Sequence, residues 1–149
     1  DSEITLHMQG KTIQLKIATP EKLIYEAVVD HVSLPTVDGE ITILPGHVPL
    51  ISRISSGEIT AGEKNEKVPF VIVGGFAEIN GESVIVLADF AEDVRDITDE
   101  HIEIARNRAE ELKRMKEDED VNFEHFESEL ERSLTKVKIA DKYRTRKYH

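Results

Sequence analysis

Hydrophobic and polar residues alternate along the first half of the chain with the two-residue period of β-strands. Thr12–Ile17 shows this most clearly, with its hydrophobic side chains on one face and its polar side chains on the other. The turn residues Thr19-Pro20-Glu21-Lys22 follow. Leu23–Leu34 is then long enough for two strands that meet at a bend near Ala27 or Asp30.

Two chain reversals are predicted in the segment from Asp38 to Ser52. Asp38-Gly39 is a hairpin turn signal, and the alternation that follows it in Glu40–Ile43 predicts a short strand. Pro45-Gly46 predicts a second reversal before the apolar run Val48–Ile51. The segment therefore predicts a rigid, irregular polar rim at one end of a sheet.

Two glycine-containing sequences organise the strands that follow. Gly74-Gly75 breaks the strand pattern and fits a bulge or a close backbone approach better than a phosphate cradle, because it lacks a strand–loop–helix context. Asn80-Gly81 predicts a tight hairpin. Val68–Val73 and Val84–Leu87 are apolar on both faces, as in strands enclosed by a sandwich. The strands predicted in this region are Gly57–Thr60, Val68–Val73, Phe76–Ile79 and Ser83–Ala88.

Beyond the strands, hydrophobic residues recur at helical spacing. Thr98 or Asp99 can cap a first helix, and Asn122 can cap a second one, with Val121 and Phe126 placed for a hydrophobic staple. Each helix has a single apolar stripe and the link between them is short, which predicts an antiparallel hairpin with facing stripes. The stripes are Ile97, Ile102, Ala105, Ala109, Leu112 and Met115, then Phe123, Phe126, Leu130, Leu134, Val137 and Ala140.

Short strands at regular intervals favour an antiparallel β-sandwich or barrel. We predict an α+β chain, with an antiparallel β-sandwich domain over residues 8–95 and a two-helix antiparallel hairpin over residues 96–149. The hairpin has few large residues to bury, so we expect it to be marginally stable alone and able to rearrange. This is the physical basis for expecting a switch.

Composition narrows the function classes. The net charge of −11 argues against nucleic acid, whose phosphates would repel the chain. The absence of cysteine excludes thiol nucleophiles and cysteine metal sites. No apolar run approaches the roughly 18 residues of a membrane span, and Asp1–His7 lacks the features of a secretion signal. We therefore expect a soluble cytosolic protein, or one held at a membrane only through a protein partner. Met8 could be the native start.

The charges of the second helix form two blocks. Residues 117–131 contain eight acidic and no basic side chains, whereas residues 132–149 contain seven basic side chains and a single acid, Asp141. Acids early and bases late suit the helix dipole, which accounts for part of this arrangement. The positive surplus at the end exceeds what a dipole needs, so the tail is a candidate for binding an acidic protein surface.

Sequence motifs for catalysis are absent. The chain has no P-loop lysine motif, no H-E-x-x-H and no G-x-S-x-G. His101 and His125 lie on opposite helices of the hairpin, but a third ligand is missing, so no metal site is predicted. His47 fits a structural or interface role better than that of a base. We therefore predict neither an enzyme nor a catalytic or metal-binding residue.

Four segments together resemble the ε subunit of bacterial F-type ATP synthase, and they cover nearly the whole chain. The first carries an acidic-Gly-Glu and a Pro-Gly-His-x-Pro-Leu sequence, which the family shares. The segments are Asp38-Gly-Glu-Ile-Thr-Ile-Leu-Pro-Gly-His-Val-Pro-Leu50, Val73-Gly-Gly-Phe-Ala-Glu-Ile79, Val84-Ile-Val-Leu-Ala-Asp89 and Leu130-Glu-Arg-Ser-Leu-Thr-Lys-Val-Lys-Ile-Ala140.

The resemblance implies a non-catalytic rotor subunit of the central stalk, peripheral on the cytoplasmic face of the bacterial cell membrane. Its sandwich would bind the gamma (γ) subunit and rest on the c-ring, so that proton flow is coupled to ATP synthesis. Glu40 falls at the family position that faces the c-ring loops, and His47 falls near the γ contact. Both are partner-binding residues by this resemblance.

The family's hairpin can also extend toward the alpha and beta subunits of the catalytic head and inhibit ATP hydrolysis. Its basic second helix then meets an acidic loop of the beta subunits. Because each exposed pair is worth only about 0.2–1 kcal/mol, a cluster of bases is needed. The residues that would supply it here are Lys136, Lys138, Lys142, Arg144, Arg146 and Lys147.

Some members of the family bind ATP at the hairpin through an Ile/Leu-Asp-x-x-Arg-Ala motif preceded by a glutamate. This chain keeps Glu92 and Ile97 but has Thr98 for the aspartate and His101 for the arginine, while Asp99 could substitute after a shift of one residue. Glu92, Asp99 and His101 are thus weak candidates, and no cofactor is predicted. Two alternatives to the rotor subunit remain: an ATP-sensing switch, and an unrelated β-sandwich enzyme with a helical tail.

Overall fold

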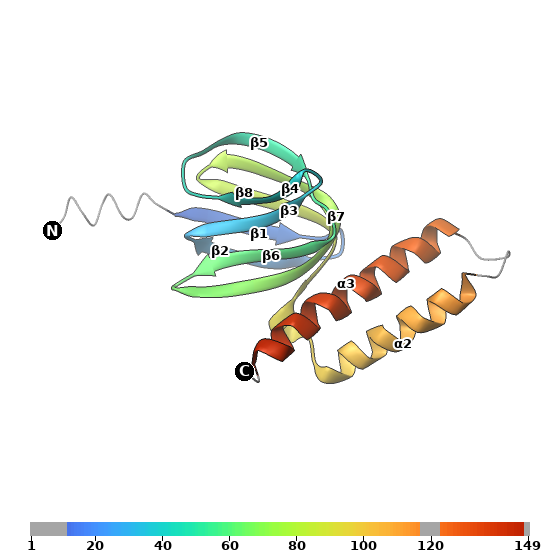
Figure 1. Cartoon of the computed structure of the whole chain (residues 1–149). Helices are drawn as coiled ribbons and strands as arrows, with labels where there is room; N and C mark the ends of the chain where they lie inside the picture. Colours follow the sequence, from blue (N-terminus) through green and yellow to red (C-terminus); the bar gives the residue numbers. More distant parts are fainter. Residues whose placement is uncertain (1–11, 117–122, 148–149) are drawn as a thin grey trace, which may run out of the picture. The chain divides into compact units, whose positions relative to one another are not determined.

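The computed structural model describes residues 12–116 and 123–147. The chain divides into two compact units, Asp1–Asp93 and Val94–His149. The strands all belong to the first unit and the two long helices to the second, within the part of the chain that is described (Figure 1). The possible start at Met8 lies outside the described residues.

The first unit is an eight-stranded sheet that folds over into a sandwich. Its strands follow the order β2-β1-β8-β7-β6-β3-β4, and β5 pairs with β7. The strands are β1 Ile13–Ala18, β2 Leu23–Val29, β3 His31–Thr36, β4 Gly39–Ile43, β5 His47–Arg53, β6 Gly57–Glu63, β7 Glu66–Gly81 and β8 Ser83–Asp93.

Strand β7 is the centre of this unit. One of its edges pairs with β8, whereas the other edge pairs with β6 near its start and with β5 near its end. Most neighbouring strands are antiparallel, but β1 and β8 run parallel. The predicted β-sandwich followed by two packed helices is confirmed, with the correction that the sheet is mixed.

The core lies between the layers and follows from the alternation in the sequence. The hydrophobic residues of β1 are fully buried, as predicted, and the predicted strand Val68–Val73 is buried on both faces. Val84–Leu87 is different, because only Val84 and Val86 face the core while Ile85 and Leu87 are exposed. The prediction that this strand is enclosed on both faces is therefore wrong.

The predicted turns are present in the structure at their glycine residues. Gly39 adopts a φ of 117° at the β3–β4 turn, and Gly46 adopts a φ of 83° at the turn closed by the His47 N–H donating to the Leu44 carbonyl at 3.1 Å. The bend inside the long strand segment lies at Asp30, one of the two predicted positions. Gly81 has a φ of 56° in the tight β7–β8 hairpin.

Gly74 and Gly75 do not end a strand, in contrast to the prediction, because β7 passes through both. Their φ angles are 69° and 114°, and the value at Gly75 is one that residues with a side chain rarely adopt. A Cβ on Gly75 would lie 2.2 Å from the Leu87 carbonyl oxygen. The interpretation as a close backbone approach is confirmed.

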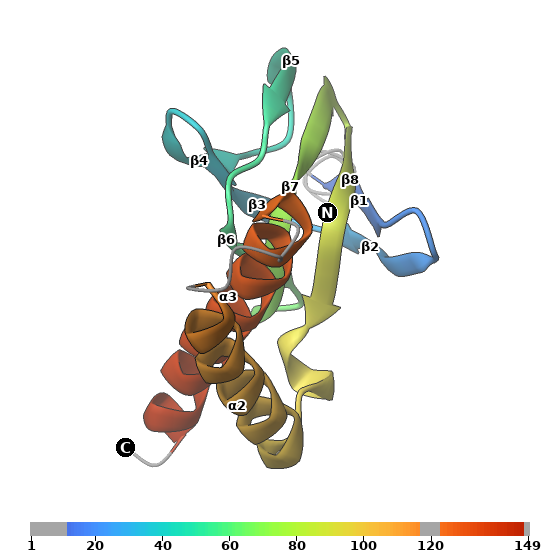
Figure 2. The same cartoon turned by 90° about the vertical axis from the view of Figure 1, so that its right-hand side faces the viewer.

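The second unit begins with the short 3₁₀ helix η1 Val94–Asp96, which leads into α2 Asp99–Met115 and α3 Phe123–Lys147. The two helices run antiparallel side by side (Figures 1 and 2). Thr98 is the N-cap of α2, which confirms one of the two predicted alternatives. The predicted link, the Asn122 cap and the Val121 staple lie outside the described residues.

The seam of α3 differs from the predicted stripe. Phe126, Ser133 and Ala140 are buried at intervals of seven residues, whereas Leu134 is 40% exposed. A seven-residue repeat keeps one line of a helix against its partner, and a stripe through Leu134 leaves that line. On α2 the predicted residues Ile102, Ala105, Ala109 and Leu112 are buried, whereas Met115, which was also predicted, is 38% exposed. Neither described helix is long and apolar enough to cross a membrane.

Candidate partner-binding surfaces

Four exposed hydrophobic residues lie together on the outer face of the sandwich, and we call them the apolar patch. Phe76 on β7 is paired with Leu87 on β8, and Glu78 on β7 is paired with both Ile51 on β5 and Ile85 on β8. Paired residues of neighbouring strands point to the same face, so the four hydrophobic side chains are neighbours. Their exposed fractions are 73% for Ile51, 54% for Phe76, 37% for Ile85 and 60% for Leu87.

Charged residues surround and interrupt the apolar patch. Arg53 is paired with Phe76 at the β5 side, and Lys16 is paired with Ile85 at the β1 side. Glu78 lies between Ile51 and Ile85 in the middle of the patch. An exposed apolar area bordered by polar residues is typical of a protein-binding surface.

Sequence reasoning missed this patch, although a signal for it was present. The Asn80-Gly81 turn sets the register of β7 against β8, and that register places Ile85 beside Glu78. Glu78 is exposed, so its neighbour faces solvent as well. The apolar character of Val84–Leu87 concealed this alternation.

Glu40 and His47 lie at two successive turns of the sandwich. Glu40 is exposed on β4, where it is paired with Pro35 beside the β3–β4 turn. His47 begins β5, and its Nδ1–H donates to the Val48 carbonyl oxygen at 2.8 Å. This hydrogen bond assigns the proton of the neutral ring to Nδ1 and leaves Nε2 as an acceptor. Both residues are therefore available at the rim of the sandwich.

Ion pairs connect the two helices along the hairpin. Arg108 donates from Nε and Nη2 to the two carboxylate oxygens of Glu129, at 2.6 and 3.2 Å. These hydrogen bonds lower the pKa of Glu129 and raise the pKa of Arg108. Arg106 donates to Asp141 at 2.8 Å. These side chains are a third or more exposed, so each pair adds little to stability.

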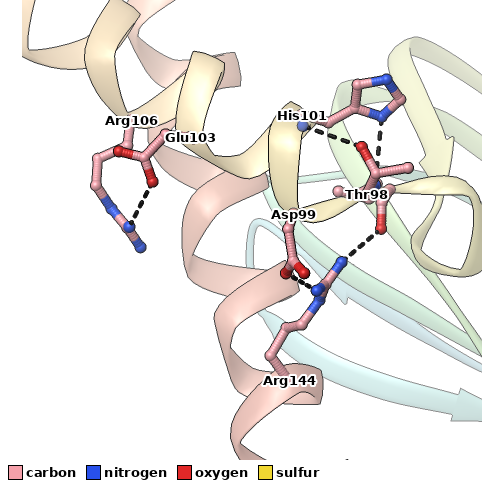
Figure 3. A network of polar contacts seen from close by, with 7 residues as sticks. Thr98, Asp99, His101, Glu103, Arg106 and Arg144 are labelled. Carbon is pink, nitrogen blue, oxygen red and sulfur yellow. Dashed lines mark hydrogen bonds and ion pairs between the residues drawn. The ribbon is translucent and has the colours of Figure 1, made fainter.

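A network of polar contacts closes the end of the hairpin where α2 begins and α3 ends (Figure 3). Thr98 Oγ1 accepts a hydrogen bond from the His101 N–H at 3.1 Å, and the Thr98 N–H donates to His101 Nδ1 at 3.3 Å. Arg144 forms an ion pair with Asp99 and donates to the Ile97 carbonyl oxygen at 3.0 Å. We call this set of residues the hairpin base.

The two charged residues of the hairpin base lie at helix ends that favour their charges. Asp99 is at the positive end of the α2 dipole and Arg144 is near the negative end of the α3 dipole, so each charge suits its own helix as well as its partner. Arg144 also satisfies a carbonyl that precedes the helix. The network therefore ties the start of α2 to the end of α3.

Only some residues of the predicted basic cluster are exposed in the structure. Lys138 and Lys142 are exposed, and the Lys142 ammonium lies 5.4 Å from the ring centre of Tyr143. Lys136 is partly buried, and Arg144 is engaged in the hairpin base. The side chains of Arg146 and Lys147 lie outside the described residues.

The weak nucleotide candidates fall into different units. Glu92 is on β8 in the first unit, whereas Asp99 and His101 belong to the hairpin base in the second. Asp99 Oδ1 already pairs with Arg144, and His101 Nδ1 already accepts from the Thr98 N–H. His101 and His125 lie at opposite ends of the antiparallel hairpin, which separates them, and no group of three possible metal ligands occurs among the described residues.

Comparison with known proteins gives a consistent result. Residues 12–94 match the family described as ATP synthase, Delta/Epsilon chain, beta-sandwich domain. The ATP synthase epsilon chain of Halalkalibacterium halodurans is 35% identical over 130 residues, which cover 87% of this chain and 97% of the relative. The sodium ion specific ATP synthase epsilon chain of Propionigenium modestum is 32% identical and covers 89% of this chain and 96% of the relative.

Two solved structures share the fold. A chain of the Euglena gracilis mitochondrial ATP synthase superposes with a TM-score of 0.66 at 22% identity, covering 87% of this chain and 81% of that chain. A chain of the central stalk and c-ring structure of the Tetrahymena thermophila enzyme superposes with a TM-score of 0.53 at 12% identity, covering 86% and 96%.

Proposed function

Because this chain belongs to the family of ATP synthase epsilon chains, we propose that its sandwich links the γ subunit to the c-ring in the rotor of an F-type ATP synthase. The chain is a non-catalytic subunit of the central stalk. It transmits rotation through its contacts, while bond formation takes place in other subunits.

The apolar patch is the observation that supports docking on γ. Four large hydrophobic side chains on the paired strands β5, β7 and β8 remain exposed. Fully burying such a side chain contributes about 1.5–3 kcal/mol, so a partner that covers the patch gains substantially. The face formed by β5, β7 and β8 is a continuous set of paired strands, which can lie along the side of an elongated shaft. We assign it to γ.

The two turns of the rim support contacts with both partners, the c-ring and γ. Glu40 is exposed beside the β3–β4 turn, where a carboxylate can meet polar loops of the c-ring. His47 presents an acceptor nitrogen at the start of β5, within the same strand as Ile51 of the apolar patch. We therefore assign Glu40 to the contact with the c-ring and His47 to the contact with γ. Contact with the membrane is then made only through the c-ring, on the cytoplasmic face of the bacterial cell membrane.

The hairpin supports a regulatory role in ATP hydrolysis. Its seam combines the large buried residues Ile102, Leu112 and Phe126 with small residues, and exposed ion pairs also join the helices. The small residues of the seam are Ala105, Ala109, Ser133 and Ala140. Exposed ion pairs add little stability and alanines bury little surface, so we infer that the hairpin opens more readily than the sandwich does. When it opens, Arg144 leaves Asp99 and joins Lys138 and Lys142 as a basic surface for the acidic loop of the beta subunits in the catalytic head.

The experiment uses the full chain and a truncation after Asp93, since the first unit has a hydrophobic core of its own. We expect both forms to bind γ, and only the full chain to inhibit ATP hydrolysis by the complex of alpha, beta and γ subunits. Failure of the full chain to bind γ would refute the docking role. Equal hydrolysis with both forms would refute the regulatory role alone.

A further inference from the structure

We propose that the part of γ that covers the apolar patch carries a lysine or arginine that pairs with Glu78. This inference rests on the proposed function, because it takes γ as the partner of the patch. It adds a charge requirement to a surface that is otherwise hydrophobic.

The position of Glu78 is fixed by the register of three strands. Its pairing partners are Ile51 on β5 and Ile85 on β8. Phe76, two residues earlier on the same strand, faces the same side and is paired with Leu87. Hydrophobic side chains of the patch therefore flank the Glu78 carboxylate on both neighbouring strands and along β7.

The chain itself does not neutralise Glu78. No hydrogen bond or ion pair of this carboxylate occurs within residues 12–116 and 123–147. Arg53 is on β5 beside Phe76, and Lys16 is on β1 beyond Ile85, yet neither forms an ion pair with Glu78. The carboxylate is therefore available to a partner.

Covering the patch removes water from Glu78. A carboxylate that loses its hydration without gaining a partner strongly opposes binding. A flat hydrophobic partner would therefore bind poorly, although the four neighbouring side chains favour it. A partner with a cation above Glu78 satisfies both requirements, and the charge also fixes the register of docking. This favours a shaft segment in which a basic residue stands among hydrophobic ones.

The test measures the affinity of the full chain for γ with Glu78→Gln and Glu78→Lys. Glu78 is exposed in the free chain, so both variants should fold, which circular dichroism can check. We expect about a 10-fold loss of affinity for Glu78→Gln and about a 100-fold loss or more for Glu78→Lys. Glu26→Lys is the matched control, because Glu26 is exposed on β2, is paired with Lys16 and lies outside the patch. Its affinity should change by less than about 3-fold.

A compensating charge reversal on γ is the most direct test of the pairing. One basic residue of γ, changed to glutamate, should restore the binding that Glu78→Lys loses. Wild-type affinity for both Glu78 variants would overturn the inference and leave docking on γ intact. A wild-type chain that does not bind γ would instead refute the proposed function.

Discussion

A Cβ atom on Gly75 would lie 2.2 Å from the backbone carbonyl oxygen of Leu87, closer than two such atoms can approach. The φ of Gly75 is 114°, a backbone conformation that residues with a Cβ atom rarely adopt. We predict that Gly75→Ala destabilises the sandwich by about 3–5 kcal/mol, because backbone strain and overpacking act together. Urea unfolding measures the change.

Gly39→Ala is the matched control for that substitution. Gly39 has a φ of 117°, almost the same as Gly75, but a Cβ there would meet no atom within 4 Å. It should cost about 1–3 kcal/mol from backbone strain alone. Equal losses for the two variants would show that the approach to Leu87 carries no energetic weight.

The Arg144 side chain should stabilise the hairpin base more than an ordinary surface ion pair does. We predict that Arg144→Gln weakens local protection by about 1 kcal/mol, since Arg144 bonds both a carboxylate and a backbone carbonyl. Amide hydrogen exchange in the first turn of α2 measures the effect. Arg106→Gln, which breaks the exposed pair with Asp141, is the control and should leave that turn unchanged. Equal exchange in both variants would refute the special role of Arg144.

The pairing of Arg108 with Glu129 predicts a pH dependence. Hydrogen bonds from Arg108 lower the pKa of Glu129 in the folded chain. The pair therefore contributes stability above the ordinary glutamate pKa of about 4.3, and this contribution is lost as the pH falls through the lowered value. The stability difference between the wild type and Glu129→Gln should be largest near neutral pH and shrink in acid. Urea unfolding followed by helical circular dichroism measures it, and a constant difference would contradict the assignment.

Nucleotide sensing by the hairpin makes a separate prediction. Asp99 and His101 are engaged with Arg144 and Thr98, and the motif lacks the permanent cation that His101 replaces. We predict that isothermal calorimetry detects no heat when ATP is added to the full chain. Saturable heat that Arg144→Gln or His101→Ala removes would instead establish the ATP-sensing alternative.

The strands and turns could be predicted from the sequence because their causes are local. The alternation in β1, Gly39 with its positive φ, and the Pro45-Gly46 turn depend on neighbouring residues alone. Gly74 and Gly75 were harder, since a glycine pair signals an end of a strand as readily as a close approach. Only the position of β8 decides between these outcomes.

Tertiary packing determined the features that the sequence did not predict. Leu87 and Val86 are both apolar, and only the register with β7 decides which of them faces the core. Ser133 is buried and Leu134 is exposed, the reverse of the expectation, because small residues allow the helices to approach along a seven-residue repeat. Hydrophobicity alone favours leucine over serine, so the seam required the structure, whereas the apolar patch required the register that the Asn80-Gly81 turn sets.

The affinity of the full chain for γ, compared between Leu87→Glu and Val28→Glu, tests the docking role most directly. Both residues are exposed hydrophobics of the same sheet, at 60% and 55%, but Val28 is on the edge strand β2 outside the apolar patch. We predict that Leu87→Glu lowers the affinity by about 100-fold or more and that Val28→Glu changes it by less than about 3-fold. Wild-type affinity for Leu87→Glu would contradict the assignment of this face to the rotor shaft.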